Sequence, residues 1–578
     1  MIGTFKFFAV AAFASGLLAG SASDTVEPDA IYHGGKIVTV NEAFEVAEAI
    51  AIRDGRIVAV GTDREIRALA GAGTHEVNLR GRTIVPGFYD NHVHLGDERP
   101  QLWRGGLISR VPDWIRGADT LEELSRRLEQ RARETPEGEW LVGGLTREEW
   151  PNQRLPTRWQ LDEIVPDHPV ALSRGPHTVV INSLAFDIVG ITRDTPDPPG
   201  GWIIRDEESG EPSGRILEAA KRLVNPHLPE SDDDRGPAIE QYHRGLSQLL
   251  ELGITSLNVA GVRPEALHDL QDLYERHGSE LPRMTVQLRV SPGYDTYDDP
   301  VLGARETLAE LEGIGFRTGF GNERLKIGAV KMSIDGGLSA PVMWTRDAYH
   351  GRPDFFGVQR IPDETFYEVG KFAHDRGWQL GIHTIGDGAV VMVVDQLARI
   401  LRESPRENHR HYLHHVNVKP PEETLRTMGE LEIMVATHPS WTTNLGAYTA
   451  EAVGPGPKLE TQNPSRSLLD HGIRISYGSD GLPLGPLVAV SNAVTRLGWD
   501  NRVYGPEEAV SVEDAIRFHT MGTAYMTFDE HIKGSLEVGK VADFVILAED
   551  ILTIDPELIG QVRIDATIVG GKEVFVAN

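Results

Sequence analysis

The chain has 578 residues, with 57 lysines and arginines against 86 aspartates and glutamates, a formal net charge of −29. This acidic balance argues against a nucleic-acid-binding protein, which needs a basic face. Cysteine is absent from the sequence, which excludes disulfides, thiolate metal sites and a cysteine nucleophile. Any metal site must be built chiefly from histidine, aspartate, glutamate or a modified lysine.

The first residues have the pattern of a secretory signal peptide. Lys6 supplies a positive charge, a mostly apolar stretch covers residues 7–19, and small residues follow at 20–23. The apolar stretch is too short to span a bilayer comfortably. We predict that residues 1–23 are a cleaved signal peptide and that the protein is exported, periplasmic or secreted. An uncleaved N-terminal anchor is the alternative.

Short strands joined by tight turns occupy both ends of the mature chain. Residues 30–40, 49–60 and 566–576 each place Gly-Gly or Asp-Gly between apolar runs, which is typical of β-hairpins. Neither end can bury the face of a sheet alone. We therefore predict one small β-sandwich formed by residues 24–83 and 530–578.

Between these ends, strand-like apolar runs alternate with helical patterns. The expected strands lie at 84–94, 253–259, 283–290, 326–332, 379–383, 411–416, 432–438 and 474–479. Eight βα units in one array are typical of an α/β fold, the TIM-type (β/α)8 barrel, here over residues 84–529. The segment 96–247 is too long for a bare loop, and we predict that it is a subdomain inserted after the first barrel strand.

Polar residues at the strand ends indicate a metal centre, because the active sites of such barrels lie at the carboxyl ends of the strands. His92 and His94 end the first strand, and side chains at i and i+2 point to one face, so both imidazoles can bind one ion. Further candidates on this rim are Lys331 in strand four, His383 ending strand five, His415 ending strand six and Asp480 after strand eight.

Four segments give the chain a specific resemblance to a known family. They lie at 86–94, 175–183, 381–387 and 533–544, in that order. With them the chain resembles the amidohydrolase superfamily, in particular amidohydrolase family 3, which includes N-substituted formamide deformylases. The resemblance covers nearly the whole mature chain.

The resemblance implies a centre with two divalent metal ions. Zinc is expected, with manganese or iron as alternatives. His92, His94 and Asp480 would hold one ion. The second would be held by His383 and His415. Lys331, carboxylated on its amine, would bridge the two ions; an ordinary buried lysine in an ion pair is the alternative.

The family pattern also draws attention to residues around these ligands. Relatives usually have glutamate before the histidine of strand six, where this chain has His414, and Asp-Ala-Gly after strand two, where residues 259–261 are Val-Ala-Gly. Neither departure removes a ligand. We predict that His177 and His438 contact substrate, with a structural role as the alternative for each.

These observations predict a metal-dependent hydrolase that cleaves a non-peptide C–N bond, an amide, of a small organic substrate through a metal-bound hydroxide. Asp480 would move the proton. A lactone, ester or phosphoester hydrolase on the same site is the first alternative, and a catalytically inactive small-molecule-binding protein is the second. The expected partner is a small-molecule substrate, with no nucleic acid, no membrane after signal cleavage and a homodimer left open.

Overall fold

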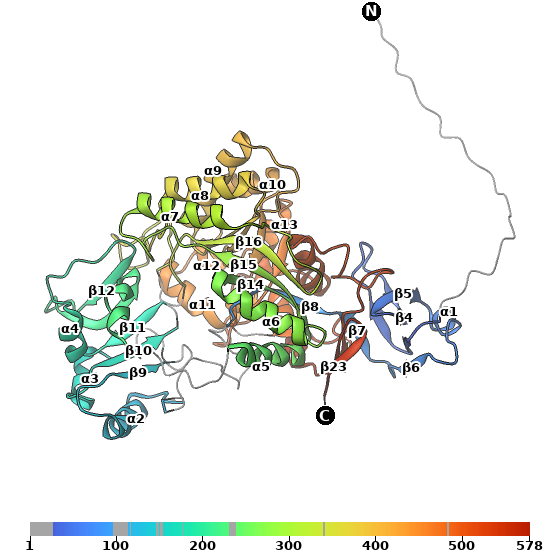
Figure 1. Cartoon of the computed structure of the whole chain (residues 1–578), viewed down its shortest axis with the longest axis horizontal. Helices are drawn as coiled ribbons and strands as arrows, with labels where there is room; N and C mark the ends of the chain where they lie inside the picture. Colours follow the sequence, from blue (N-terminus) through green and yellow to red (C-terminus); the bar gives the residue numbers. More distant parts are fainter. Residues whose placement is uncertain are drawn as a thin grey trace, which may run out of the picture.

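The computed structural model describes residues 27–95, 114–115, 117–145, 150, 154–175, 177–229, 238–338, 342–482 and 485–577. The predicted signal peptide, residues 1–23, lies outside the described residues. Figure 1 shows the terminal β-strands on one side, a central barrel with its helices, and a separate sheet on the opposite side. Within the described part of the chain, no helix is both long and apolar enough to cross a membrane.

An eight-stranded parallel sheet forms the centre of the molecule. In order across the sheet, its strands are β8 (Phe88–Val93), β14 (Ile254–Val262), β15 (Arg283–Arg289), β16 (Leu325–Ser333), β17 (Leu380–Thr384), β18 (Tyr412–His415), β19 (Met434–Thr437) and β20 (Ile475–Tyr477). The first and last strands also meet, because Asn91 donates to Ser476 Oγ at 2.9 Å. The sheet closes into a barrel, and the predicted TIM-type fold is confirmed.

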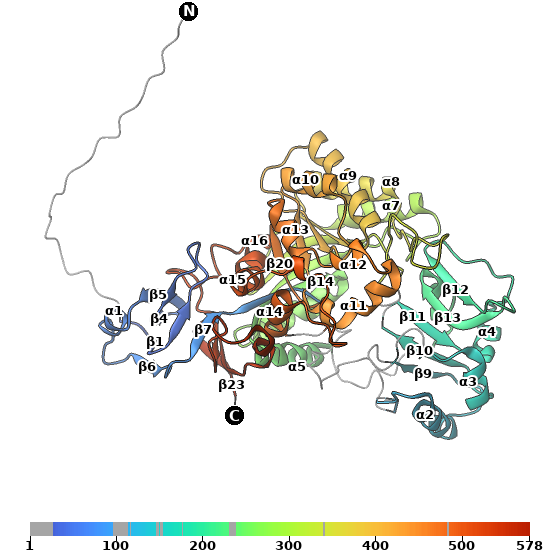
Figure 2. The same cartoon turned by 180° about the vertical axis from the view of Figure 1, so that it is seen from behind.

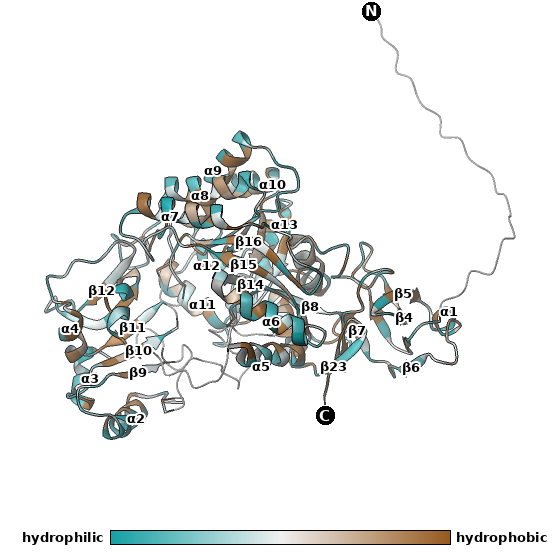
Figure 3. Ribbon diagram, viewed as in Figure 1, coloured by the Kyte–Doolittle hydropathy of each residue, from teal (hydrophilic) through white to brown (hydrophobic). Residues whose placement is uncertain are grey.

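Helices follow the barrel strands along the chain and cover the outside of the barrel (Figures 1 and 2). They are α5 (Ala238–Glu251), α6 (Leu267–His277), α7 (Pro300–Gly313), α8 (Asp363–Asp375), α9 (Asp387–Glu403), α10 (Glu422–Glu430), α11 (Ser440–Val453), α12 (Pro457–Glu460), α13 (Ser465–Asp470), α14 (Pro486–Thr495), α15 (Val512–Arg517) and α16 (Thr523–Met526). Helix α5 carries both hydrophilic and hydrophobic segments (Figure 3), as expected for a helix with one buried face.

The predicted first strand, 84–94, is divided between two sheets. Strand β7 (Thr83–Pro86) pairs with strands of the terminal sheet, and only β8 belongs to the barrel. Gly87 lies between them, and a Cβ there would come within 2.0 Å of Thr255 Oγ1. Glycine therefore permits the close approach of β8 to β14. Both segments are fully buried, so hydrophobic periodicity does not reveal the boundary.

Strands from both ends of the chain form the terminal β-sandwich. One sheet has the order β23 (Lys572–Val576), β22 (Ile564–Val569), β21 (Phe544–Leu547), β7, β2 (Lys36–Val38) and β3 (Val46–Ala47). The other has the order β5 (Arg56–Gly61), β4 (Ala49–Arg53), β1 (Ala30–His33) and β6 (His75–Asn78), with helix α1 (Asp63–Arg67) beside it. They share a core that includes Tyr32, Ile50 and Phe544. The predicted sandwich of both termini is confirmed.

The insertion after β8 contains a five-stranded sheet of its own. Its order is β12 (Gly201–Arg205), β13 (Pro212–Glu218), β11 (Thr178–Ile181), β10 (Val170–Arg174) and β9 (Leu141–Gly144). Helices α2 (Leu121–Glu134), α3 (Arg158–Ile164) and α4 (Ser183–Val189) accompany this sheet. A separate hydrophobic core around Leu124, Leu141 and Val170 supports it, as expected for a subdomain rather than a loop.

A buried ion pair joins the barrel to the terminal sandwich. Arg283 donates from Nε and Nη2 to the two carboxylate oxygens of Asp543, at 2.6 and 3.1 Å. Burial alone would raise the pKa of Asp543, but the charge of Arg283 holds it below its ordinary value. The pair's contribution to the free energy of unfolding is therefore present above about pH 4 and is lost as the pH falls through the lowered pKa.

We expect Arg283→Met to lower the free energy of unfolding by about 3–5 kcal/mol, because the carboxylate of Asp543 stays buried without its partner. Urea denaturation at neutral pH measures the loss. The double variant that adds Asp543→Leu should recover most of it. A double variant no more stable than Arg283→Met would contradict this account of the pair.

Candidate metal centre

The carboxyl ends of the barrel strands bring the predicted ligands together at one rim. His92 lies near the end of β8 and Asp480 follows β20, the adjacent strand of the closed barrel; the backbone N–H of Asp480 donates to the carbonyl oxygen of His92 at 3.0 Å. Lys331, His383 and His415 lie near or at the carboxyl ends of β16, β17 and β18. The side chains discussed below therefore come from strands that neighbour one another around the barrel.

His92, His94 and Asp480 form a compact group of three donors. The Nε2 atoms of the two histidines lie 3.2 Å apart, and Asp480 Oδ1 lies 3.5 Å from His92 Nε2 and 3.2 Å from His94 Nε2. In a tetrahedral zinc site with Zn–N bonds of about 2.0–2.1 Å, neighbouring ligand atoms are separated by about 3.3 Å. The three donor atoms thus have the spacing that one such ion requires.

His383 and His415 form the second group. Nδ1 of His383 lies 2.9 Å from Nε2 of His415. On its other side, Nε2 of His383 lies 3.4 Å from Asp335 Oδ1. Asp335 accepts hydrogen bonds from the backbone N–H groups of Ile385 and Gly386, at 3.0 and 2.9 Å, and so holds the loop after β17 next to His383.

Lys331 lies buried on the same rim with no hydrogen-bond partner for its Nζ among the described residues. Burial, with the nearby charge of Arg289, lowers the pKa of the amine well below its ordinary value, although Asp480 opposes the shift. An unpartnered buried amine is costly in a stable protein. Among the residues that the structure describes, Lys331 thus has no ion pair of the kind expected for an ordinary buried lysine. Its unpartnered amine is compatible with a role in a metal site.

Burial also keeps the candidate ligand imidazoles neutral. The pKa values of His92, His383 and His415 are all lowered well below the ordinary value, first by burial and then by neighbouring histidines and Lys331. Metal ligation needs the lone pair of a neutral imidazole. These three histidines are therefore ready to bind a cation at neutral pH without losing a proton first.

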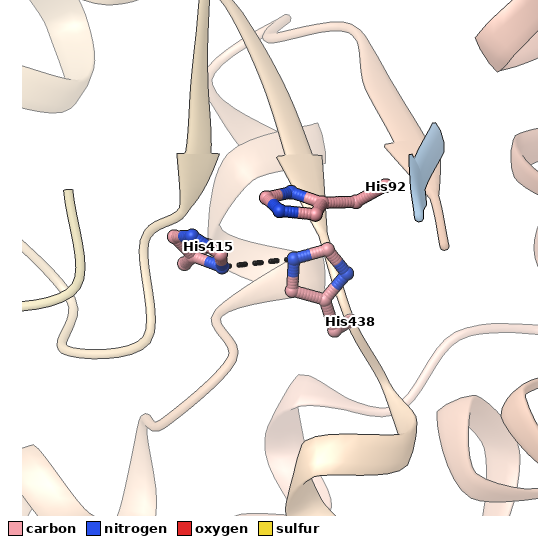
Figure 4. Close-up of side chains that lie close together, drawn as sticks. All are labelled: His92, His415 and His438. Carbon is pink, nitrogen blue, oxygen red and sulfur yellow. Dashed lines mark hydrogen bonds between the residues drawn. The ribbon is translucent and has the colours of Figure 1, made fainter. Parts of the chain in front are cut away.

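His438, at the carboxyl end of β19, contacts His415. Its Nε2 lies 2.9 Å from His415 Nδ1 (Figure 4), and its side chain is fully buried. This contact leaves Nε2 of His415 to face His383. One donor atom each of His92, His415 and His438 also lies within 4.8 Å of the others, so the rim has a second group of three donors, in which all three are histidines. The substrate contact predicted for His438 stays a prediction.

His177 and Glu218 lie where the inserted subdomain meets the barrel. Nδ1 of His177 lies 3.0 Å from Glu218 Oε1, and Glu218 also accepts from the backbone N–H of Gly337 at 3.1 Å. Arg360 forms an ion pair with the same carboxylate. Burial raises the pKa of Glu218, but Arg360 and His177 together hold it below its ordinary value. The sequence contains no pattern that links Glu218 and Arg360, because they meet only in the folded chain.

Asp90 is a functional neighbour that sequence reasoning missed. Its Oδ1 accepts from the backbone N–H groups of His92 and Ser479, at 3.0 and 3.1 Å, and its Oδ2 accepts from Ser479 Oγ at 2.6 Å. Asp90 thereby fixes the spacing between His92 and Asp480. Burial raises its pKa to about 6. The signal available in the sequence was a carboxylate two residues before His92, directly after the mostly apolar residues 84–89.

Two of the site residues have a left-handed backbone that is uncommon outside glycine. The φ angles are +73° at His415 and +51° at Asp480. Such conformations cost about 1–3 kcal/mol each and concentrate at functional sites. Here they turn the chain at the ends of β18 and β20 so that both side chains are aimed along the rim.

Comparisons with known proteins identify the family of this chain. The family model described as "Amidohydrolase family" matches residues 75–575. The chain is 30% identical to Protein LONG AFTER FAR-RED 3 of Arabidopsis thaliana, over 95% of this chain and 91% of that protein. It is 29% identical to the N-substituted formamide deformylase of Arthrobacter pascens, over 89% and 92%, and 27% identical to the putative amidohydrolase YtcJ of Bacillus subtilis, over 94% and 99%.

Solved structures show the same fold. Uncharacterized metal-dependent hydrolases of Pyrococcus furiosus and Pyrococcus horikoshii superpose with TM-scores of 0.63 and 0.66, at 24% and 23% identity. Each match covers 91% of this chain and 100% or 99% of the other. This chain shares its closed parallel barrel with these two structures. This chain belongs to the amidohydrolase family, and the family membership predicted from its four sequence segments is confirmed.

Proposed function

We propose that this amidohydrolase cleaves a non-peptide C–N bond, an amide such as a formamide, in a small organic molecule. The observation that carries the proposal is the donor group of His92, His94 and Asp480, whose three ligand atoms lie 3.2–3.5 Å apart. The similarity to the N-substituted formamide deformylase supports the choice of bond, since it extends over most of both chains.

The donor set fits two divalent ions, with zinc preferred by the imidazole and carboxylate ligands. His92, His94 and Asp480 would hold one ion, and His383 and His415 the other. When bound, the ions would polarise the carbonyl oxygen of the substrate and lower the pKa of water.

Lys331 completes this proposed centre once its amine is carboxylated. The lowered pKa of Lys331 favours the neutral form of its amine, and the lone pair of a neutral amine can attack the carbon of CO2. The nitrogen then loses one proton, and a carbamate with two oxygen ligands results. Such a carbamate would bridge the ions and satisfy the amine that is otherwise buried without a partner.

Asp480 is the residue we assign to proton transfer. Its side chain is 16% exposed, so it reaches both the buried imidazoles and the mouth of the barrel. Its carboxylate would accept a proton as water attacks the carbonyl carbon, and would pass the same proton to the leaving nitrogen as the C–N bond breaks. One carboxylate at one position serves both steps, because the water and the leaving group approach the same carbon.

The inserted subdomain is the proposed source of substrate contacts. His177 keeps 18% of its side chain exposed while Glu218 anchors the ring. It lies beside the loop after β16, since the position of a Cβ on Gly337 would come within 2.5 Å of its ring. We propose that His177 lies at the mouth of the barrel and contacts the substrate. We also propose that the protein is exported from the cytoplasm.

A substrate panel tests the choice of bond. Zinc-loaded protein should hydrolyse N-substituted formamides or N-acyl amino acids with a kcat/KM well above that for lactones and aryl esters. The same preparation treated with a chelator should lose the activity and regain it with zinc. A preference for lactones, esters or phosphoesters over every amide would overturn the proposal while leaving the family membership intact.

A further inference from the structure

His414 occupies the position before the metal-ligand candidate His415 and turns away from it, toward His92. Nδ1 of His414 lies 2.8 Å from Nδ1 of His92. On the other side of the ring, Nε2 of His414 lies 3.0 Å from Oε1 of Gln287, in strand β15. All three side chains are buried, with at most 1% of their surface exposed. They form a continuous hydrogen-bonded chain sealed from solvent.

Gln287, at the end of this series of hydrogen bonds, determines which atoms donate and which accept. In the orientation that the structure gives the Gln287 amide, Oε1 faces His414 and has no proton, so Nε2 of His414 is the donor in the bond between them. A neutral imidazole then has only a lone pair on its other nitrogen, so Nδ1 of His414 accepts from Nδ1 of His92. His92 therefore carries its proton on Nδ1, and its Nε2 has the lone pair. Nε2 is also the atom that faces His94 and Asp480.

We propose that His414 is a positioning residue that acts together with Gln287 to hold His92 in the tautomer that binds metal through Nε2. The inference rests on the metal site of the proposed function and adds the group that prepares one of its ligands. Hydrogen-bond partners of this kind orient ligand histidines and contribute to metal affinity.

The barrel makes room for this arrangement at Gly381. A Cβ at that position would lie 2.7 Å from Gln287 Oε1 and 2.7 Å from the hydroxyl oxygen of Tyr412. Glycine in β17 thus allows the Gln287 amide to lie in the barrel interior beside His414. Gln287 lies in β15 and His414 lies in β18. These strands are not neighbours in the sheet, so the hydrogen bond between the two side chains crosses the barrel.

Two variants at position 414 separate a tautomer effect from a packing effect. Asparagine places an amide oxygen close to the position of the histidine Nδ1, so His414→Asn keeps an acceptor for His92. Glutamine places its terminal amide near the position of Nε2, so His414→Gln faces Gln287 and leaves His92 Nδ1 without its acceptor. Both variants remove the ring. We expect zinc affinity, measured by competition with a chromophoric chelator, to fall about 10–100-fold in His414→Gln and to stay near the wild-type value in His414→Asn.

Two variants at position 287 test the far end of the chain and remain informative if a position-414 variant fails to fold. Gln287→Glu has an acceptor in either orientation of its carboxylate, so zinc affinity should be kept. Gln287→Leu removes the acceptor, and affinity should fall as it does in His414→Gln. His374→Gln is the matched control, because His374 in helix α8 and His411 just before β18 form another buried histidine pair, 2.8 Å apart, away from the carboxyl ends of the strands.

The readouts distinguish failure of the inference from failure of the proposed function. Wild-type protein that binds no zinc would defeat both. Wild-type protein that binds zinc, with equal losses in His414→Asn and His414→Gln or no loss in either, would overturn the role of His414 alone. Equal affinities of Gln287→Glu and Gln287→Leu would do the same. Thermal unfolding of the metal-free variants shows whether a loss of affinity reflects a loss of folded protein.

Discussion

Replacing Asp480 by asparagine should lower kcat/KM by about 10²–10⁴-fold, the usual contribution of a positioned acid–base group. The amide cannot accept a proton from water, and it is a weaker metal ligand than a carboxylate. The backbone should not change, because asparagine tolerates the positive φ of this position. The N–H of residue 480 still donates to the carbonyl of His92.

Steady-state kinetics of the zinc-loaded variant measures this effect, and circular dichroism shows that the fold is retained. Asp187→Asn is the control for the chemical change, since Asp187 is an exposed residue of helix α4. An Asp480→Asn enzyme with wild-type kcat/KM would remove Asp480 from the mechanism.

Replacing Lys331 by methionine should have opposite effects on activity and on stability. The variant cannot form a carbamate, so it should bind less metal than the wild-type protein and should lose its hydrolytic activity. Without metal, however, the variant should be more stable by about 1–3 kcal/mol, because a buried amine without a hydrogen-bond partner has been replaced by an apolar side chain of similar size. Urea denaturation of both metal-free proteins measures the difference.

Lys326→Met is the matched control on the same strand. Lys326 lies at the other end of β16 and pairs with the buried Asp529, and its Nζ also donates to the carbonyl oxygen of Thr527. This substitution should lower stability, because Asp529 is left with less positive charge around it, while metal content should not change. Equal metal content in Lys331→Met and Lys326→Met would argue that Lys331 is an ordinary buried lysine.

The barrel could be predicted from the sequence because its signals are local. Each strand is an apolar run with a helix pattern after it, and a polar residue at its end, as in 379–383 with His383. The ends of parallel strands in a barrel lie on one rim, so a list of strand-end residues is already a list of neighbours. The ligand candidates follow from that geometry without any knowledge of their distances.

The supporting residues could not be found in this way. Gln287, Glu218 and Arg360 make contacts across the barrel or between the barrel and the insertion, and sequence separation conceals such partners. The division of residues 84–94 between two sheets at Gly87 also escaped, because both halves are equally buried. Its cause is the close approach of Thr255, which belongs to a strand more than a hundred residues away.

The most direct test of the two-metal account is a crystal structure of the zinc-loaded protein, grown with bicarbonate, in which anomalous scattering locates the zinc. The account predicts two zinc ions, one beside His92, His94 and Asp480 and one beside His383 and His415. It also predicts planar density on the Nζ of Lys331 that reaches both ions. An unmodified Lys331 beside a single ion, or a rim without zinc, would contradict the account.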